Sequence, residues 1–305
     1  MGVRRNTILI TVVVGLGHPT SRSVAAPAGF AFLEVPAGAR GSAVGGAYAS
    51  WAQGVEALFW NPAGLAAVEG IQVTGSHYEF FQRLRHDQFA VAGRLLGGGL
   101  SAGVRALYSE AVVERDELGN EIGTFGGHDL EFSLGYGYAP SSGLRIGTSG
   151  QIVRDVIAQS AATTYSFGGG ASWTPLPRLQ TGLTVEHLGP AATHRIDGER
   201  GRPLLLPTAL QTGVSYGIDG PGHLGLQGAI EGRFTRGRSG VALLGVEFAG
   251  PSGASLRLGF RANDETARFS VGAGGTVGSL HLDYAYVPYE LDLGDTHRLS
   301  FVAQF

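Results

Sequence analysis

The last nine residues, His297-Arg298-Leu299-Ser300-Phe301-Val302-Ala303-Gln304-Phe305, alternate apolar and polar side chains and end on an aromatic residue. Successive side chains of a strand point to opposite faces, so Leu299, Phe301, Ala303 and Phe305 share one face. The C-terminal strand of a soluble β-sandwich would fit this alternation. A β-barrel of the Gram-negative outer membrane also explains the aromatic end, because its last strand must pair with the first. Phe301 and Phe305 are then the candidate signal for the barrel-assembly machinery.

The composition favours the membrane barrel. The 305 residues include 51 glycines, only 15% charged residues and no cysteine. Glycine relieves crowding where strands bend and where an internal segment approaches the wall. The net charge of -3, without a basic cluster, argues against a nucleic-acid partner. The absence of cysteine removes disulfides, thiolate metal sites and thiol nucleophiles.

The N-terminus predicts a secretory signal peptide over residues 1–25. Arg4 and Arg5 precede an apolar stretch over 7–16 that is too short to span a bilayer, and Ser23-Val24-Ala25 offers small residues for cleavage. A membrane anchor is the alternative. No later segment approaches the roughly 18 consecutive apolar residues of a transmembrane helix. We therefore expect an exported protein that crosses the outer membrane with strands.

Alternating segments recur from residue 70 to the end and predict about 14 strands. Examples are Phe89-Val91-Gly93-Leu95, Leu130-Phe132-Leu134-Tyr136-Tyr138 and Leu256-Leu258-Phe260. Tight Gly/Pro-rich turns alternate with longer polar connections, the longest near 110–127 and 189–207. This alternation is typical of a membrane barrel with periplasmic turns and outer loops. The predicted fold class is all-β, a transmembrane antiparallel barrel over residues 70–305.

Charged residues fall on the faces opposite the apolar stripes. An arginine facing lipid near the bilayer midplane would cost roughly 2–4 kcal/mol. We therefore expect these residues in the lumen, and their nearly balanced signs indicate a paired network rather than an ion-selective pore. They are Arg94, Arg105, Glu131, Glu186, Glu231, Glu247, Arg257, Arg261, Asp283 and Arg298.

Residues 26–69 carry no strand pattern and predict an N-terminal plug, or hatch, inside the barrel. Small residues crowd positions 29–49, as a segment packed in a narrow lumen requires. The stretch Trp60-Asn61-Pro62-Ala63-Gly64-Leu65 contains an Asn-Pro turn and is the candidate plug motif.

Together with Gly38-Ala39-Arg40 and Gly45-Gly46-Ala47, this motif resembles the N-terminus of the PorV/PorQ branch of the FadL-like outer-membrane proteins. The tail over 292–300 resembles the last loop and strand of the same branch. The Asn-Pro-Ala-Gly-Leu motif alone is shared across the wider FadL-like group. That group forms barrels of 14 strands with an N-terminal hatch, which agrees with the strand count.

The sequence offers little for catalysis, so a non-enzymatic protein without cofactor or metal is expected. The nine histidines lack the His-Glu-x-x-His spacing, and Gly272–Gly278 ends a strand at a turn with no helix to bind a phosphate. The acidic stretch over 110–121 lacks the ligand spacing of a calcium loop. No Ser, His and carboxylate set can be singled out from the sequence.

Two functions follow from the resemblance. PorV-like members serve type IX secretion, so the first expectation is an interaction protein in the outer membrane whose partners are secreted cargo or a translocon. The alternative is a FadL-like transporter of hydrophobic small molecules. In both cases the barrel contacts outer-membrane lipid, and its partners include the assembly machinery.

Overall fold

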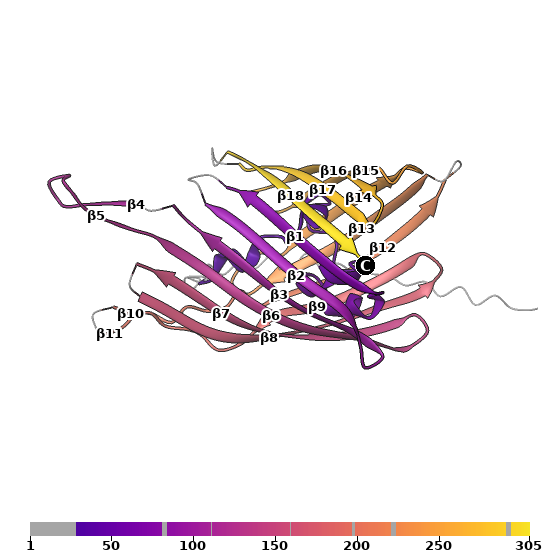
Figure 1. Ribbon diagram of the computed structural model, residues 1–305, viewed down its shortest axis with the longest axis horizontal. Helices are drawn as coiled ribbons and strands as arrows, with labels where there is room; N and C mark the ends of the chain where they lie inside the picture. Colours follow the sequence, from indigo (N-terminus) through magenta and orange to yellow (C-terminus); the bar gives the residue numbers. More distant parts are fainter. Residues whose placement is uncertain are drawn as a thin grey trace, which may run out of the picture.

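The computed structural model describes residues 29–80, 84–110, 112–158, 160–196, 199–220, 224–290 and 294–305. The predicted signal peptide lies outside these residues, as do positions 292 and 293 of the tail motif. Fourteen strands form a closed antiparallel barrel, as the sequence predicts (Figure 1). No helix among the described residues is long and apolar enough to cross a bilayer.

The barrel strands follow one another around the wall in chain order. They are β1 (Ile71–Glu79), β2 (Arg85–Leu95), β3 (Gly98–Tyr108), β6 (Gly127–Ser141), β7 (Leu144–Ile157), β8 (Ser160–Leu176), β9 (Leu179–Leu188), β12 (Ala209–Asp219), β13 (Gly225–Thr235), β14 (Val241–Ala249), β15 (Ser255–Ala262), β16 (Phe269–Val277), β17 (Leu280–Pro288) and β18 (Asp295–Gln304).

The barrel closes between β1 and β18. Gln72 pairs with Gln304 at one end of the seam and Glu79 pairs with His297 at the other. Backbone hydrogen bonds continue to the last residue: Ile71 N donates to Phe305 O at 3.1 Å, and Phe305 N donates to Ile71 O at 2.8 Å. Closure leaves no unpaired strand edge toward lipid, which a bilayer-spanning sheet requires.

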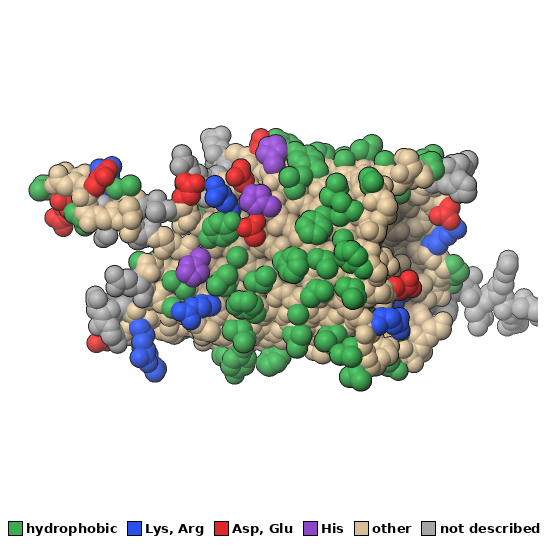
Figure 2. Space-filling model, in the orientation of Figure 1, with side chains coloured by type: hydrophobic (Ala, Val, Ile, Leu, Met, Phe, Trp, Pro, Cys, Tyr) green, Lys and Arg blue, Asp and Glu red, His purple; other side chains and the backbone are tan. Residues whose placement is uncertain are grey.

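The outward face carries the apolar side chains that the alternation predicts. Leucine, isoleucine and aromatic side chains cover the middle of the barrel, while many charged and histidine side chains gather toward the end with the outer loops (Figure 2). Phe132, Ile152 and Leu258 are each more than half exposed. Surfaces of this kind are stable only against lipid, so the chain is a barrel of the outer-membrane type.

Two of the long outer connections contain hairpins. One is formed by β4 (Val112–Arg115) and β5 (Glu121–Phe125), and it projects well beyond the barrel (Figure 1). The other is formed by β10 (Arg195–Ile196) and β11 (Glu199–Arg200). The sequence predicts only polar loops there, because short strands without an apolar face leave little periodicity.

The N-terminal segment lies inside the barrel as four short helices. They are η1 (Ala31–Glu34), α1 (Ala39–Ala43), η2 (Gly54–Phe59) and η3 (Pro62–Ala67). Most of their residues are buried against the inward faces of the strands. We call residues 29–35 the outer cover and residues 36–69 the inner plug.

A row of four glycines brings the wall close to the inner plug. Gly99, Gly137, Gly147 and Gly170 are direct cross-strand neighbours on β3, β6, β7 and β8. A Cβ atom on Gly147 would overlap Pro62, one on Gly170 would overlap Asn61, and one on Gly99 would overlap Leu65. The η3 backbone therefore packs directly on the backbone of the wall, which explains part of the high glycine content.

Candidate functional site: a luminal cavity beneath the outer cover

The motif Trp60–Leu65 is buried at the centre of the inner plug. The Asn61 side chain accepts from Ala63 N at 3.1 Å and caps η3, while Pro62 occupies the first turn of the helix. The amide of Asn61 donates to Ala49 O at 2.9 Å and Trp60 Nε1 donates to Ala37 O at 3.1 Å. The motif thus ties three stretches of the inner plug together.

Charged side chains of the wall hold the inner plug. Arg40 forms a bidentate pair with Glu247 at 2.9 and 2.7 Å. Glu231 accepts from Ser50 N at 2.8 Å, from Ser50 Oγ at 2.6 Å and from Ala49 N at 3.2 Å. Bidentate and charge-assisted hydrogen bonds of this kind are the strongest available, and here they connect the plug to β13 and β14.

The predicted luminal charges all lie on the inward side, and most of them contact an oppositely charged or polar side chain. Arg257 bridges Glu247 and Asp283 at 2.5 and 2.6 Å. Arg105 pairs with Glu131. Glu186 pairs at 2.8 Å with Arg233, which is not among the predicted luminal charges. Arg298 donates to Ser42 Oγ at 2.8 Å and stacks on Tyr78.

Two of these residues depart from the predicted network. Arg261 pairs with Asp264 of an outer loop at 3.0 Å. Arg94 has no ion-pair partner among the described residues and lines a cavity of about 730 Å³ at the periplasmic end. That cavity is also lined by Arg40, Glu56 and Arg145, so it is a polar cavity on the periplasmic side of the inner plug. Arg94 remains solvent-exposed, and so needs no buried partner.

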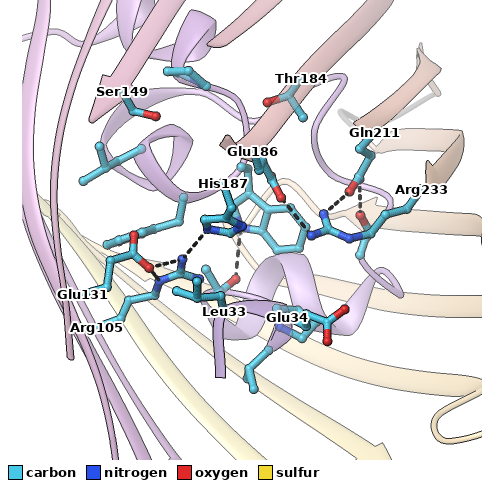
Figure 3. A pocket seen from close by; sticks show the side chains of 18 of the residues that line it. Leu33, Glu34, Arg105, Glu131, Ser149, Thr184, Glu186, His187, Gln211 and Arg233 are labelled. Carbon is cyan, nitrogen blue, oxygen red and sulfur yellow. Dashed lines mark hydrogen bonds and ion pairs between the residues drawn. The ribbon is translucent and has the colours of Figure 1, made fainter. Parts of the chain in front are cut away.

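A second cavity, of about 50 Å³, lies between the outer cover and the inner plug (Figure 3). Its apolar lining includes Leu33 of the cover with Phe59 and Trp60 of the plug. Its charged lining consists of Glu34, Glu131, Glu186, Arg105, Arg233 and Arg261, so three acids face three arginines. The cavity is therefore electrically balanced, and it has room for a few waters at most.

An apolar cluster surrounds the outer cover beside this cavity. It consists of Phe30, Phe32, Leu33, Val153, Ala162, Ala192 and Leu206, with Leu107 and Leu204 packed against it. Ala192, Leu204 and Leu206 come from the long connection between β9 and β12, so that outer loop folds down onto the cover. The cover itself is one 3-10 turn preceded by Phe30 in the left-handed region, at φ 58°.

His187 is the site residue that sequence reasoning missed. A bulge in β9 shifts the pairing with β8, and His187 at φ 55° turns into the lumen directly after the inward Glu186. In Figure 3 its ring lies between the Arg105–Glu131 and Arg233–Glu186 pairs. The one sequence signal of this bulge is a change of alternation. The outward apolar residues Leu183 and Val185 have odd numbers, whereas the next one, Leu188, has an even number.

The outer mouth also brings together a serine, a histidine and an aspartate. Ser160 Oγ lies 3.0 Å from His194 Nδ1, and His194 Nε2 lies 3.5 Å from Asp155. The Ser160 hydroxyl donates to Arg195 O at 2.8 Å, so its proton is directed away from the histidine. The geometry fits a latch that holds the outer loop on β7 and β8 better than a nucleophile with its base. Among the described residues, no group of three or more His, Asp or Glu is arranged to hold a metal.

These features define an outer-membrane barrel of 14 strands with an N-terminal segment in its lumen. Among solved structures, the toluene transporter TodX of Pseudomonas putida is similar with a TM-score of 0.64 at 14% identity, over 88% of this chain and 98% of that chain. A Pseudomonas aeruginosa FadL homologue is similar with a TM-score of 0.54 at 12% identity, over the same shares. The fold is thus FadL-like. No protein-family model matches the chain, and no curated protein matches it.

Proposed function

We propose that the protein admits small hydrophobic molecules through the outer membrane, with the outer cover as its movable part. The observation that carries this proposal is the apolar cluster around Phe30, Phe32 and Leu33, which leads to a cavity floored by Phe59 and Trp60. An apolar solute would meet the side chains of this cluster and of Phe59 along this path, beside the paired charges that also line the cavity. The FadL-like fold, shared with a toluene transporter, supports the same function.

The PorV/PorQ resemblance favours secretion or interaction over hydrophobic transport. We reverse this order because similarity to the toluene transporter and the apolar entrance both favour transport. The Ser160–His194–Asp155 contact offers no activated nucleophile, so we also propose that the protein is not an enzyme.

Uptake of a radiolabelled monoaromatic hydrocarbon tests the proposal in a bacterial host that lacks its own FadL-like barrels. Expression of the protein should increase the initial uptake rate, and Phe59→Gln should return it toward the background, because a polar amide replaces apolar surface in the path. Shortening residues 110–127 to a Gly-Ser turn is the matched control and should leave uptake unchanged. Equal uptake with and without the protein would contradict the proposal.

One observation favours a second function, the binding of a secreted protein as expected from the PorV/PorQ resemblance. The β4–β5 hairpin projects from the barrel with Val113, Leu118 and Ile122 exposed, and Leu118 is 87% exposed (Figure 1). Exposed loops on a rigid scaffold are where recognition residues usually lie. If this function is correct, shortening the hairpin abolishes co-purification of the cargo while hydrocarbon uptake stays at the wild-type rate.

A further inference from the structure

We infer that the cavity beneath the outer cover binds a neutral aromatic molecule through an acceptor oxygen, such as that of an aromatic ketone, with His187 as the donor. The inference rests on the proposed function and names the class of ligand for its passage. It depends on three features of the cavity: an unused hydrogen-bond donor, a balance of charges and an aromatic floor.

The first feature is the protonation of His187. Its Nε2 lies 3.5 Å from Arg105 Nη2, and a guanidinium can only donate, so Nε2 is the acceptor of this contact. The proton of the neutral ring is then on Nδ1. His187 is 5% exposed, and its Nδ1 has no hydrogen-bond partner among the described residues. The cavity wall thus contains a buried N–H group whose hydrogen bond is unmade.

The second feature is that the unused groups of this cavity are donors. Arg261, which also lines it, has an Nε without a partner in the described chain. The carboxylates of Glu131 and Glu186 are occupied by Arg105 and Arg233. A buried donor without a partner is unfavourable, whereas an incoming acceptor would satisfy it. The complementary ligand therefore brings an oxygen that accepts, rather than a group that donates.

The third feature separates neutral ligands from anions. The three arginines that line the cavity face three glutamates, and Glu34 is further bound by Arg238 at 2.5 Å. No excess positive charge is present to compensate a buried carboxylate, which would be costly to desolvate. A ketone, ester or aryl ether oxygen fits this balance, and the rings of Phe59 and Trp60 fit an aromatic body.

The ligand needs the outer cover to move, because the closed cavity has room for a few waters at most. The cover is suited to this, since a single 3-10 turn held mostly by apolar contacts is far less constrained than the inner plug. A ring entering beneath Leu33 would place its oxygen beside His187 and its body beside Phe59, whose ring carries the Arg105 guanidinium on one face.

The test compares two ligands that differ in one group. Acetophenone has a carbonyl oxygen where α-methylstyrene has a methylene group, and the two have nearly the same shape. Binding to the purified full chain in detergent is measured by calorimetry, with empty micelles as the blank. We expect acetophenone to bind about tenfold more tightly, as one hydrogen bond to a buried donor provides. Equal affinities of the wild-type protein for the two ligands would overturn the inference.

Variants locate the effect at His187. In His187→Phe, which keeps a planar ring but removes the donor, the affinity for acetophenone should fall to that for α-methylstyrene. His187→Asn restores an N–H donor in a residue that tolerates the left-handed backbone, and should recover part of the preference. His297→Phe changes an exposed histidine on the outer wall and serves as the control. A preference that persists in His187→Phe would contradict the assignment.

The outcomes also separate this inference from the proposed function. If hydrocarbon uptake depends on the protein but the two ligands bind equally, the proposed transport function is supported and the oxygen-specific site is wrong. If neither ligand binds and no hydrocarbon enters, both proposals fail. Nitrogen-15 spectra of histidine-labelled protein provide an independent check, because acetophenone and not α-methylstyrene should shift the Nδ1–H signal of His187.

Discussion

The outer cover and the inner plug belong to one continuous segment, yet the barrel holds them in different ways. The inner plug packs backbone to backbone on the glycine row and is fixed by Glu231, Glu247 and Arg298. The outer cover is held mainly by Phe30, Phe32 and Leu33 against an outer loop, with one ion pair from Glu34. Direct backbone packing leaves no room for movement, whereas side-chain contacts with a loop can separate. We therefore propose that the inner plug is fixed and that the outer cover above it moves.

The largest expected effect concerns Phe305, at the end of the seam between β18 and β1, next to the point where the chain leaves the inner plug. We propose that Phe305 is part of the signal read by the assembly machinery, and its backbone pairs with Ile71 beside the start of β1. Deleting Phe305, or replacing it with Asp, should abolish assembly while export continues. Heat-modifiable barrel in outer-membrane fractions measures this, and wild-type levels in either variant would contradict the signal.

The second prediction tests the fixed plug directly. In Gly147→Val the new side chain overlaps Pro62, so either the plug leaves its place or the barrel is destabilised by about 3 kcal/mol or more. Urea unfolding in detergent and heat modifiability measure the loss. Gly150→Val is the matched control on the same strand, because that position faces outward with only ordinary contact to Phe167. Similar stability of the two variants would show that the glycine row does not hold the inner plug.

The third prediction compares the two regions by removing them in turn. We propose that residues 26–69 occlude the lumen, so a variant without them should increase single-channel conductance in planar bilayers severalfold. Removing only residues 26–35 takes away the cover and leaves the inner plug, which should change conductance little. An equal increase in both variants would mean that the inner plug blocks nothing.

The smallest effect concerns the ion pair on the cover. Burial raises the pKa of Glu34, although Arg238, Arg233 and Arg261 act in the opposite direction. A raised carboxyl pKa means that the docked cover favours the protonated acid. The docked state should therefore lose stability as the pH rises from the usual carboxyl range through the raised pKa.

Hydrogen exchange of residues 29–36, corrected for its intrinsic pH dependence, measures this loss. Protection should decrease by up to about 1 kcal/mol in the wild-type protein, and Glu34→Gln should show no such decrease. Protection that increases with pH in the wild-type protein would contradict the assignment.

The sequence alone determined the architecture, because strand periodicity is local. The apolar stripes ending at Phe305 place one face of each strand toward lipid, and the cost of charge in a bilayer places Arg105, Glu131 and Arg257 inside. The small residues of 29–49 and the Asn61-Pro62 turn likewise indicate a compact luminal segment. These inferences require only the neighbours of each residue along the chain.

The tertiary structure alone decided how that segment is held and where the cavity lies. The glycine row consists of residues on β3, β6, β7 and β8, and their register depends on pairing between distant segments. His187 enters the lumen only because a bulge in β9 reverses the alternation, and its unmade hydrogen bond depends on Arg105 from β3. Contacts between residues far apart in sequence arise when the barrel closes, so no local pattern could specify them.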